Sequence, residues 1–190
     1  YLLQVLGDGD WWVRSRACDA LAKIGGPKVL SAVMQLIRDK DENIRRAAIE
    51  ILNQTKDEAA VKHLLQATED DDWWVSERAV DALGEIGDVL AVPRLLKMLN
   101  GGPKSVPPVA RALGKIGDKE VVPQLLGLLQ RPETNIITET ISALAKLVDE
   151  TNAARIRGAI QPMLTVANDD VVTTATKAME YINTLFPPAQ

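Results

Sequence analysis

The sequence predicts an all-α fold, namely a right-handed α-solenoid of about five to six two-helix repeats. One observation is the phrase Asp-Trp-Trp-Val, which begins at Asp10 and again at Asp72. Another is a Leu-x-x-(Ile/Leu) pattern that returns at a step of about 31 residues over almost the whole chain. The third is composition, because 46% of the 190 residues are hydrophobic and only 4% are aromatic, as closely packed helices require.

Each repeat is expected to hold two helices, which we call helix A and helix B. Helix A of the first copy places Val13, Ala17 and Leu21 on one face, which is an apolar stripe at helical spacing. Helix B is most evident at residues 89–99 and 120–129, where a proline in the first turn has no N–H to lose. By the repeat step, helix A is expected at residues 12–24, 43–55, 74–86, 107–116, 136–148 and 170–184.

Cap residues mark where these helices begin and end. An aspartate stands before helix A in three copies, where its carboxylate can accept from free N–H groups: Asp10, Asp41 and Asp72. A glycine follows helix A where a left-handed cap is needed: Gly25, Gly87 and Gly117. Other aspartates lie in the turn between the two helices: Asp57, Asp88, Asp118 and Asp149. One helix pair cannot bury its apolar stripe alone, so neighbouring layers should cover Ala20, Leu21, Leu52, Leu83, Leu113 and Leu144.

The repeats are expected to form a single array that is part of a larger protein. Residues 1–9 align with the end of a helix B, so the chain opens within a repeat and upstream residues are expected to be missing. The fourth repeat has Pro107 and Pro108 at the start of its helix A, which predicts a short helix that begins there. The repeats are expected at residues 10–40, 41–71, 72–102, 103–132 and 133–168, followed by a C-terminal cap helix in 169–190.

The repeated unit has a recognisable pattern. It runs Asp-x-x-Val-Arg-x-x-Ala-x-x-Ala-Leu-x-x-Ile-Gly-Asp and continues with Ala-Val-Pro-x-Leu-Leu-x-x-Leu. This pattern resembles the bacterial HEAT-like repeat of the phycobilisome-lyase type over roughly residues 10–182. The resemblance implies a fold and leaves the activity open, since this family includes bilin lyase subunits, scaffold proteins, a DNA glycosylase branch and deoxyhypusine hydroxylase. The last of these needs several His-Glu pairs for its metals, and this chain has one His and no such pair.

Composition and charge narrow the possible functions. A net charge of −4 without a Lys/Arg stripe disfavours a nucleic-acid partner. No apolar run approaches about 18 residues, so no membrane span is expected. The single cysteine, Cys18, falls at an apolar position of helix A and is expected to be a core residue in a reducing, cytoplasmic protein. No metal-ligand spacing or phosphate-binding loop is present, so neither a metal, a cofactor nor an enzymatic activity is expected.

The two tryptophan pairs are the first candidate site. Adjacent residues at a helix start point about 100° apart, so one tryptophan of each pair should be buried and the other exposed. We expect Trp12 and Trp74 to pack against the neighbouring repeat, and Trp11 and Trp73 to point outward on one shared rim. Exposed tryptophans of this kind would serve as anchors for an extended partner, whereas two buried pairs would be purely structural.

The second candidate site lies on helix B, which by resemblance lines the concave face of such a solenoid. One register position carries glutamines in successive copies, at Gln35 and Gln66, and then Lys97. The position three residues earlier carries His63, Arg94 and Gln124. These side chains are expected to form a mostly neutral, polar strip with a small basic spot, suited either to an extended peptide backbone or to nothing more than solvent.

The sequence thus favours a non-catalytic protein-binding scaffold or regulatory module that recognises its partner on the helix B face or on the tryptophan rim. By resemblance, the alternative is a bilin lyase or chaperone-type subunit that holds a tetrapyrrole or its acceptor protein.

Overall fold

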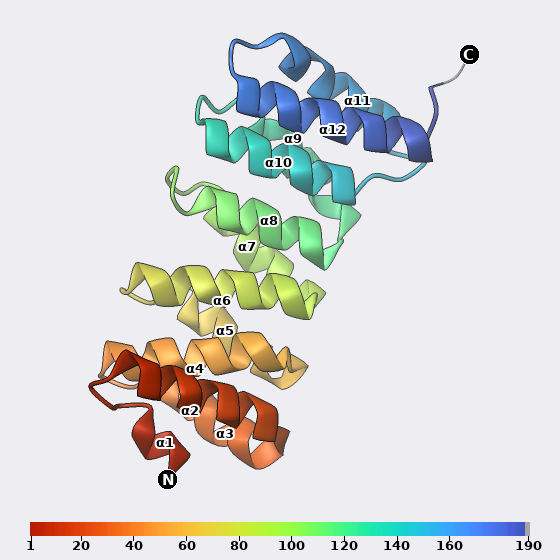
Figure 1. Ribbon diagram of the computed structural model, residues 1–190. Helices are drawn as coiled ribbons and strands as arrows, with labels where there is room; N and C mark the ends of the chain where they lie inside the picture. Colours follow the sequence, from red (N-terminus) through yellow and green to blue (C-terminus); the bar gives the residue numbers. More distant parts are fainter. Residues whose placement is uncertain (189–190) are drawn as a thin grey trace. The chain divides into compact units, whose positions relative to one another are not determined.

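The structure, a computed structural model, describes residues 1–188 of the chain. Within these residues it contains twelve α-helices, four short 3-10 helices and no strand (Figure 1). The all-α fold class predicted from the repeat is therefore confirmed. Contacts divide the chain into two compact units, of which the first is Tyr1–Ala91 and the second begins at Val92.

In the first unit, α2, α4 and α6 form one row of A helices, and α3 and α5 form a second row of B helices (Figure 1). Helix α4 contacts both α2 and α6. The elements are α1 (Leu2–Val5), α2 (Trp11–Ile24), α3 (Gly26–Leu36), α4 (Glu42–Thr55), η1 (Glu58–Ala60), α5 (Val61–Ala67), α6 (Trp73–Ile86) and η2 (Val89–Ala91).

The second unit repeats this plan, with α8, α10 and α12 in one row (Figure 1). Helix α8 begins at Val106 and has 11 residues against 14 in α6, with Pro107 and Pro108 in its first turn, which confirms the short helix predicted there. The elements are α7 (Val92–Met98), α8 (Val106–Ile116), η3 (Lys119–Val121), α9 (Val122–Leu128), α10 (Thr134–Lys146), α11 (Ala153–Ile160), η4 (Gln161–Thr165) and α12 (Asp169–Leu185). All six A helices of the chain lie within two residues of the ranges predicted at either end.

The N-terminal caps occur as predicted. Asp10, Asp41 and Asp72 each accept a hydrogen bond from the backbone N–H two residues later, at 2.8, 2.8 and 3.0 Å. The turn aspartates use the same geometry, and each of them accepts from a backbone N–H of the following segment: Asp57, Asp88, Asp118 and Asp149. Each cap satisfies a donor that the first turn of a helix leaves without a partner.

The C-terminal caps follow the prediction in two of the three glycines. Gly87 and Gly117 adopt the left-handed conformation, with φ of 79° and 83°. Gly25 differs, with φ 53° and ψ −154°, because α3 begins directly after it at Gly26. In the second copy Lys56 takes the left-handed position with φ 51°, which is an uncommon conformation for a residue with a Cβ.

The core is the apolar stripe that the repeat predicts. The five repeat leucines are all buried: Leu21, Leu52, Leu83, Leu113 and Leu144. The prediction for Ala20 is wrong, because this residue is only half-buried. Its counterpart Ile51 on α4 is fully buried. The difference arises because α4 is flanked by two helices of its row, whereas α2 contacts only α4 in that row.

Cys18 lies in this core, with 5% of its surface exposed, and its thiol is 3.8 Å from the carbonyl oxygen of Ala47. Burial, together with the nearby carboxylates of Glu50 and Asp19, raises the pKa of the thiol to about 11. The thiol therefore stays protonated at neutral pH, as expected for a core residue and not for a nucleophile.

Candidate functional site

Three of the four tryptophans of the Asp-Trp-Trp-Val phrases are exposed on α2 and α6. Trp11 is 69% exposed, Trp12 57% and Trp73 70%, while Trp74 is half-buried. The outward orientation predicted for Trp11 and Trp73 is confirmed, whereas the burial predicted for Trp12 is wrong. Trp74 is covered only in part.

The two inner tryptophans differ for the same reason as Ala20 and Ile51. The side chain of Trp74 lies on the side of α6 that faces α4, where its ring is 5.6 Å from the guanidinium of Arg78, and Arg78 contacts Glu50 of α4. Trp12 occupies the equivalent side of α2, where the structure has no further A helix. The guanidinium of Arg16 lies 6.0 Å from its ring.

Trp11 and Trp74 flank a groove over α4 with a volume of about 360 Å³. Ala47 and Cys18 contribute the apolar floor, and Asn43 lies at the end nearest the helix starts. We call this surface the Trp-flanked groove, and it is lined by Trp11, Arg14, Ser15, Cys18, Asp19, Asn43, Arg46, Ala47, Glu50, Gln54 and Trp74. All of these residues belong to A helices of the first unit, so rigid elements position the groove.

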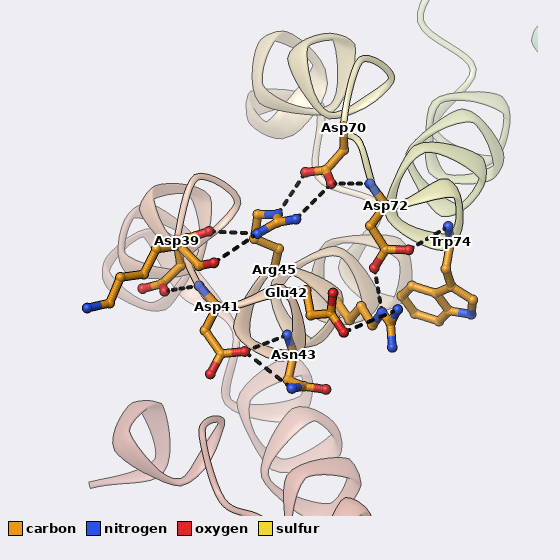
Figure 2. A network of polar contacts seen from close by, with 10 residues as sticks. Asp39, Asp41, Glu42, Asn43, Arg45, Asp70, Asp72 and Trp74 are labelled. Atoms are coloured by element: carbon orange, nitrogen blue, oxygen red, sulfur yellow. Dashed lines mark hydrogen bonds and ion pairs between the residues drawn. The ribbon is translucent and has the colours of Figure 1, made fainter.

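Two arginines of α4 fix the start of α6 beside the groove (Figure 2). Arg45 binds Asp70 through two hydrogen bonds, at 2.8 and 3.0 Å, and also donates to the backbone carbonyl of Asp39 at 3.0 Å. Arg46 binds Asp72 at 2.5 Å. Because Asp72 also caps the N–H of Trp74, this network sets the position of one wall of the groove.

Electrostatics within this network follow from the same contacts. The hydrogen bond from Arg46 is the main cause that holds the pKa of Asp72 below its ordinary value, and the capped N–H of Trp74 acts in the same direction. The side chain of Asp72 is only 5% exposed, whereas that of Arg46 is 39% exposed, so solvent weakens the pair.

We expect Asp72→Ala to lower the free energy of unfolding by about 1–2 kcal/mol, because it removes a cap and an ion pair together. Asp10→Ala is the matched control, since Asp10 caps Trp12 in the same way and forms no ion pair within residues 1–188, and it should cost about 1 kcal/mol or less. A carboxyl whose pKa is lowered on folding stabilises above its unfolded pKa, so the effect of Asp72→Ala should fade below pH of about 4. Urea unfolding at several pH values measures this, and equal losses for the two variants would contradict it.

On the helix B side of the first unit, three predicted site residues come together. Gln35, His63 and Gln66 line a second groove of about 390 Å³ with Arg38 and Lys62, and we call it the helix B groove. Arg38 donates a hydrogen bond to Oε1 of Gln66. The ring atom Nδ1 of His63 is buried, and the described chain offers it no partner.

The other predicted helix B residues belong to the second unit, where Lys97 and Gln124 are exposed and Arg94 is half-buried. Sequence reasoning missed the groove residues of α4, namely Asn43, Glu50 and Gln54. The repeat register contains a signal for one of them, since Asn43 takes in α4 the place that Trp12 and Trp74 take in α2 and α6.

The described chain has neither a membrane-spanning helix nor a cluster of metal-binding side chains. Within residues 1–188, no helix combines the length and the apolar character that crossing a membrane requires. In the same residues, no group of three His, Cys, Asp or Glu side chains is placed to hold a metal ion.

Stacked pairs of antiparallel helices, capped by aspartate and repeated at a constant step, define a helical repeat protein. The chain belongs to the HEAT-repeat family: HEAT repeats match residues 1–75 and 56–106, and the PBS lyase HEAT-like repeat matches residues 109–131. The resemblance stated from the sequence is thereby confirmed. No curated protein matches the sequence.

Solved structures with a similar fold include natural and designed repeat proteins. The complex of CpcE and CpcF of phycocyanin lyase from Nostoc sp. PCC7120 matches with a TM-score of 0.66 and 19% identity, over 95% of this chain and 93% of that chain. A designed armadillo repeat protein in complex with peptide (KR)4 matches with a TM-score of 0.66 and 18% identity, over 96% and 98%. An engineered protein matches with a TM-score of 0.61 and 21% identity, over 97% and 96%. At these identities the likeness concerns the fold alone.

Proposed function

We propose that this chain is a non-catalytic protein-binding module and that its binding surface is the Trp-flanked groove together with the neighbouring exposed ring of Trp73. The observation that carries the proposal is the exposure of large aromatic rings: Trp11 and Trp73 are 69% and 70% exposed on helices that begin at the same edge of the first unit. Leaving such rings in water forgoes the gain of burying them, and a partner would recover it.

The surroundings of the two rings support binding by a preformed surface. The rings stand at the first residue of α2 and α6, and Asp10 and Asp72 cap these two helices. The arginine network from α4 holds the second of these starts in place. A partner therefore meets a surface that needs little ordering, and little of its binding energy is lost to organising the site.

The similar structures also support a binding role. One is a complex of two protein chains and another is a complex of a designed repeat protein with a peptide. Repeat folds of this kind hold partners along rigid helix rows, and the present chain offers two such surfaces in its first unit. We choose the Trp-flanked groove over the helix B groove because tryptophan is the residue most enriched at binding hot spots.

A bilin lyase or chaperone-type subunit is the second candidate function. It is supported by the match of residues 109–131 to the PBS lyase HEAT-like repeat and by the aromatic walls of the groove, against which a flat conjugated ligand could stack. A titration with phycocyanobilin separates the two candidates. A saturable shift of the bilin absorbance that Trp11→Ala abolishes would favour this second function over the first.

The proposal is tested by selecting peptides from a random library against the full chain and measuring their affinities by calorimetry. We expect selected peptides to bind the Trp11→Ala/Trp73→Ala variant at least about tenfold more weakly, the effect of losing one or two hot-spot residues. The matched control is Gln35→Ala/Gln66→Ala in the helix B groove, which should leave their affinity unchanged. If the glutamine pair carries the loss and the tryptophan pair does not, the binding surface is the helix B groove.

A separate control shows whether the tryptophan variant still folds. Because Trp11 and Trp73 are mostly exposed, their double replacement by alanine should leave the melting temperature nearly unchanged. A drop of many degrees would make these residues structural and remove the basis of the proposed site.

A further inference from the structure

The loops that precede α2, α4 and α6 carry a marked excess of negative charge. They span residues 7–10, 37–41 and 68–72, and their only basic side chains are Arg38 and Lys40. Their acidic side chains are Asp8, Asp10, Asp39, Asp41, Glu69, Asp70, Asp71 and Asp72. The Trp-flanked groove opens toward these loops, because its end residues Trp11, Asn43 and Trp74 directly follow them in the chain or lie two residues later.

Only part of this charge is balanced within the protein. Asp70 and Asp72 are paired with Arg45 and Arg46 (Figure 2). In the described chain, the other aspartates whose contacts are defined accept only backbone or side-chain amide N–H groups and contact no cation: Asp8, Asp10, Asp39 and Asp41. The backbone dipole at each helix start offsets only a fraction of a charge. The three loops before α2, α4 and α6, which we call the loop row, therefore keep a net negative charge.

The tryptophan rings divide into two kinds. Trp12 and Trp74 each have an arginine of their own helix near the ring, with Arg16 at 6.0 Å and Arg78 at 5.6 Å. Within residues 1–188 no cation lies over Trp11 or Trp73, although these two rings are the more exposed ones in their pairs. Their faces are therefore available to a cation from a partner.

The groove itself offers acceptors for a peptide backbone. The side-chain amide of Gln54 donates to both Asp19 and Glu50, at 3.4 and 3.3 Å, which leaves its Oε1 without a partner in the described residues. Two cations also line the groove, and each of them has donors that bind outside it. Arg46 is bound by Asp72, and Arg14 donates to the backbone carbonyls of Asp8 and Gly9.

From the open rings and the unbalanced carboxylates together, we propose that the partner is an extended basic segment of another protein, with Lys or Arg side chains over Trp11 and Trp73. The inference rests on the proposed function and names the partner chemistry for the same surface. Charge complementarity between the loop row and the segment selects basic partners and steers their approach. The helix B groove is lined by the cations Arg38 and Lys62 and, among the described residues, by no carboxylate, so it would not attract them.

The test uses the full chain and two unlabelled peptides without aromatic residues, (Arg-Ala)4 and (Glu-Ala)4. All four tryptophans of the protein lie at the starts of α2 and α6, so intrinsic fluorescence reports on this surface. We expect (Arg-Ala)4 to change the fluorescence with a saturating curve and (Glu-Ala)4 to leave it unchanged. Raising the salt from about 50 mM to about 300 mM should weaken the binding several-fold, since these charges are exposed.

The affinity of (Arg-Ala)4 for tryptophan variants, measured by calorimetry, shows which rings of the surface form the site. Trp11→Ala/Trp73→Ala should weaken (Arg-Ala)4 binding by at least about tenfold. Trp12 is the matched control, because it is also exposed but its ring already has an arginine of its own helix nearby. Trp12→Ala should weaken the binding by less than about twofold. The inference is overturned if neither peptide binds up to about 1 mM, if both bind alike, or if Trp12→Ala costs as much as the double variant. Library-selected peptides that need Trp11 and Trp73 but lack basic residues would overturn it while leaving the proposed function intact.

Discussion

Leu83→Ala is expected to lower the free energy of unfolding of the first unit by about 2–5 kcal/mol. Leu83 lies in the last turn of α6 with none of its surface exposed, and α6 contacts both α4 and α5. Removing three carbons here leaves a cavity that fixed helices on both sides cannot close, so the loss includes packing as well as transfer free energy.

The measurement is urea unfolding followed by circular dichroism, with a matched leucine as control. Leu90 belongs to the same unit but is 65% exposed in η2, so Leu90→Ala should change the stability by no more than about 0.5 kcal/mol. A loss below about 1 kcal/mol for Leu83→Ala would mean that the leucine register does not define the core. Any loss as large for Leu90→Ala would point to a contact that the structure does not contain.

The sequence was sufficient to predict where the helices begin and end, because each signal for these positions is local. An aspartate placed before an apolar stripe determines where the chain can first satisfy the free N–H groups of a helix, and Asp10, Asp41 and Asp72 do this in three copies. The repeat step then transfers the boundary found in one copy to the next. The same step identified five buried leucines without any knowledge of their neighbours.

Burial that depends on neighbouring helices could not be predicted in the same way. Trp12 and Trp74 occupy the same place in an Asp-Trp-Trp-Val phrase, yet only Trp74 has an A helix on its own side to pack against. Ala20 and Ile51 differ for the same reason. A repeat pattern describes the average environment of a position, and a helix with a neighbour on one side only departs from that average.

The ion pairs beside the groove were missed because they connect residues that are far apart in the chain. Arg45 and Asp70 are 25 residues apart in the chain, and each residue alone is an ordinary surface charge. Lys56 is a second case of this kind. It takes the left-handed position that glycine takes in other copies, and its ammonium group reaches Glu85 of α6 at 2.6 Å. Such pairs become visible only once the helices are placed side by side.

Register alone decides which of the predicted helix B residues lie together. Gln35, His63 and Gln66 share a face because they occupy equivalent turns of successive B helices, and the structure places them around one groove. Register was not sufficient to predict the Trp-flanked groove, since part of its floor comes from α4, which has no tryptophan. There the relevant difference between copies is the replacement of a large ring by Asn43, which leaves room over α4.

In the second unit, Gly114→Ala and Gly127→Ala are expected to change stability in opposite directions. A Cβ on Gly114 of α8 would lie 2.8 Å from both Cα and Cβ of Ala143 on α10, which is closer than real Cβ contacts allow. Separating the two helices should cost about 1–3 kcal/mol. This outweighs the gain of up to about 1 kcal/mol that alanine normally brings to a helix.

Gly127 is the matched control because it also lies within a helix, α9, but in the described chain no heavy atom beyond its neighbours and the backbone of its own helix lies within 4 Å of the position its Cβ would take. Gly127→Ala should therefore stabilise by about 0.5–1 kcal/mol through the backbone entropy of the unfolded chain. Melting curves of the two variants measured side by side decide the matter. If Gly114→Ala also raised the melting temperature, α8 and α10 would not be in backbone contact there. The glycine would then not be the residue that lets these two helices approach closely.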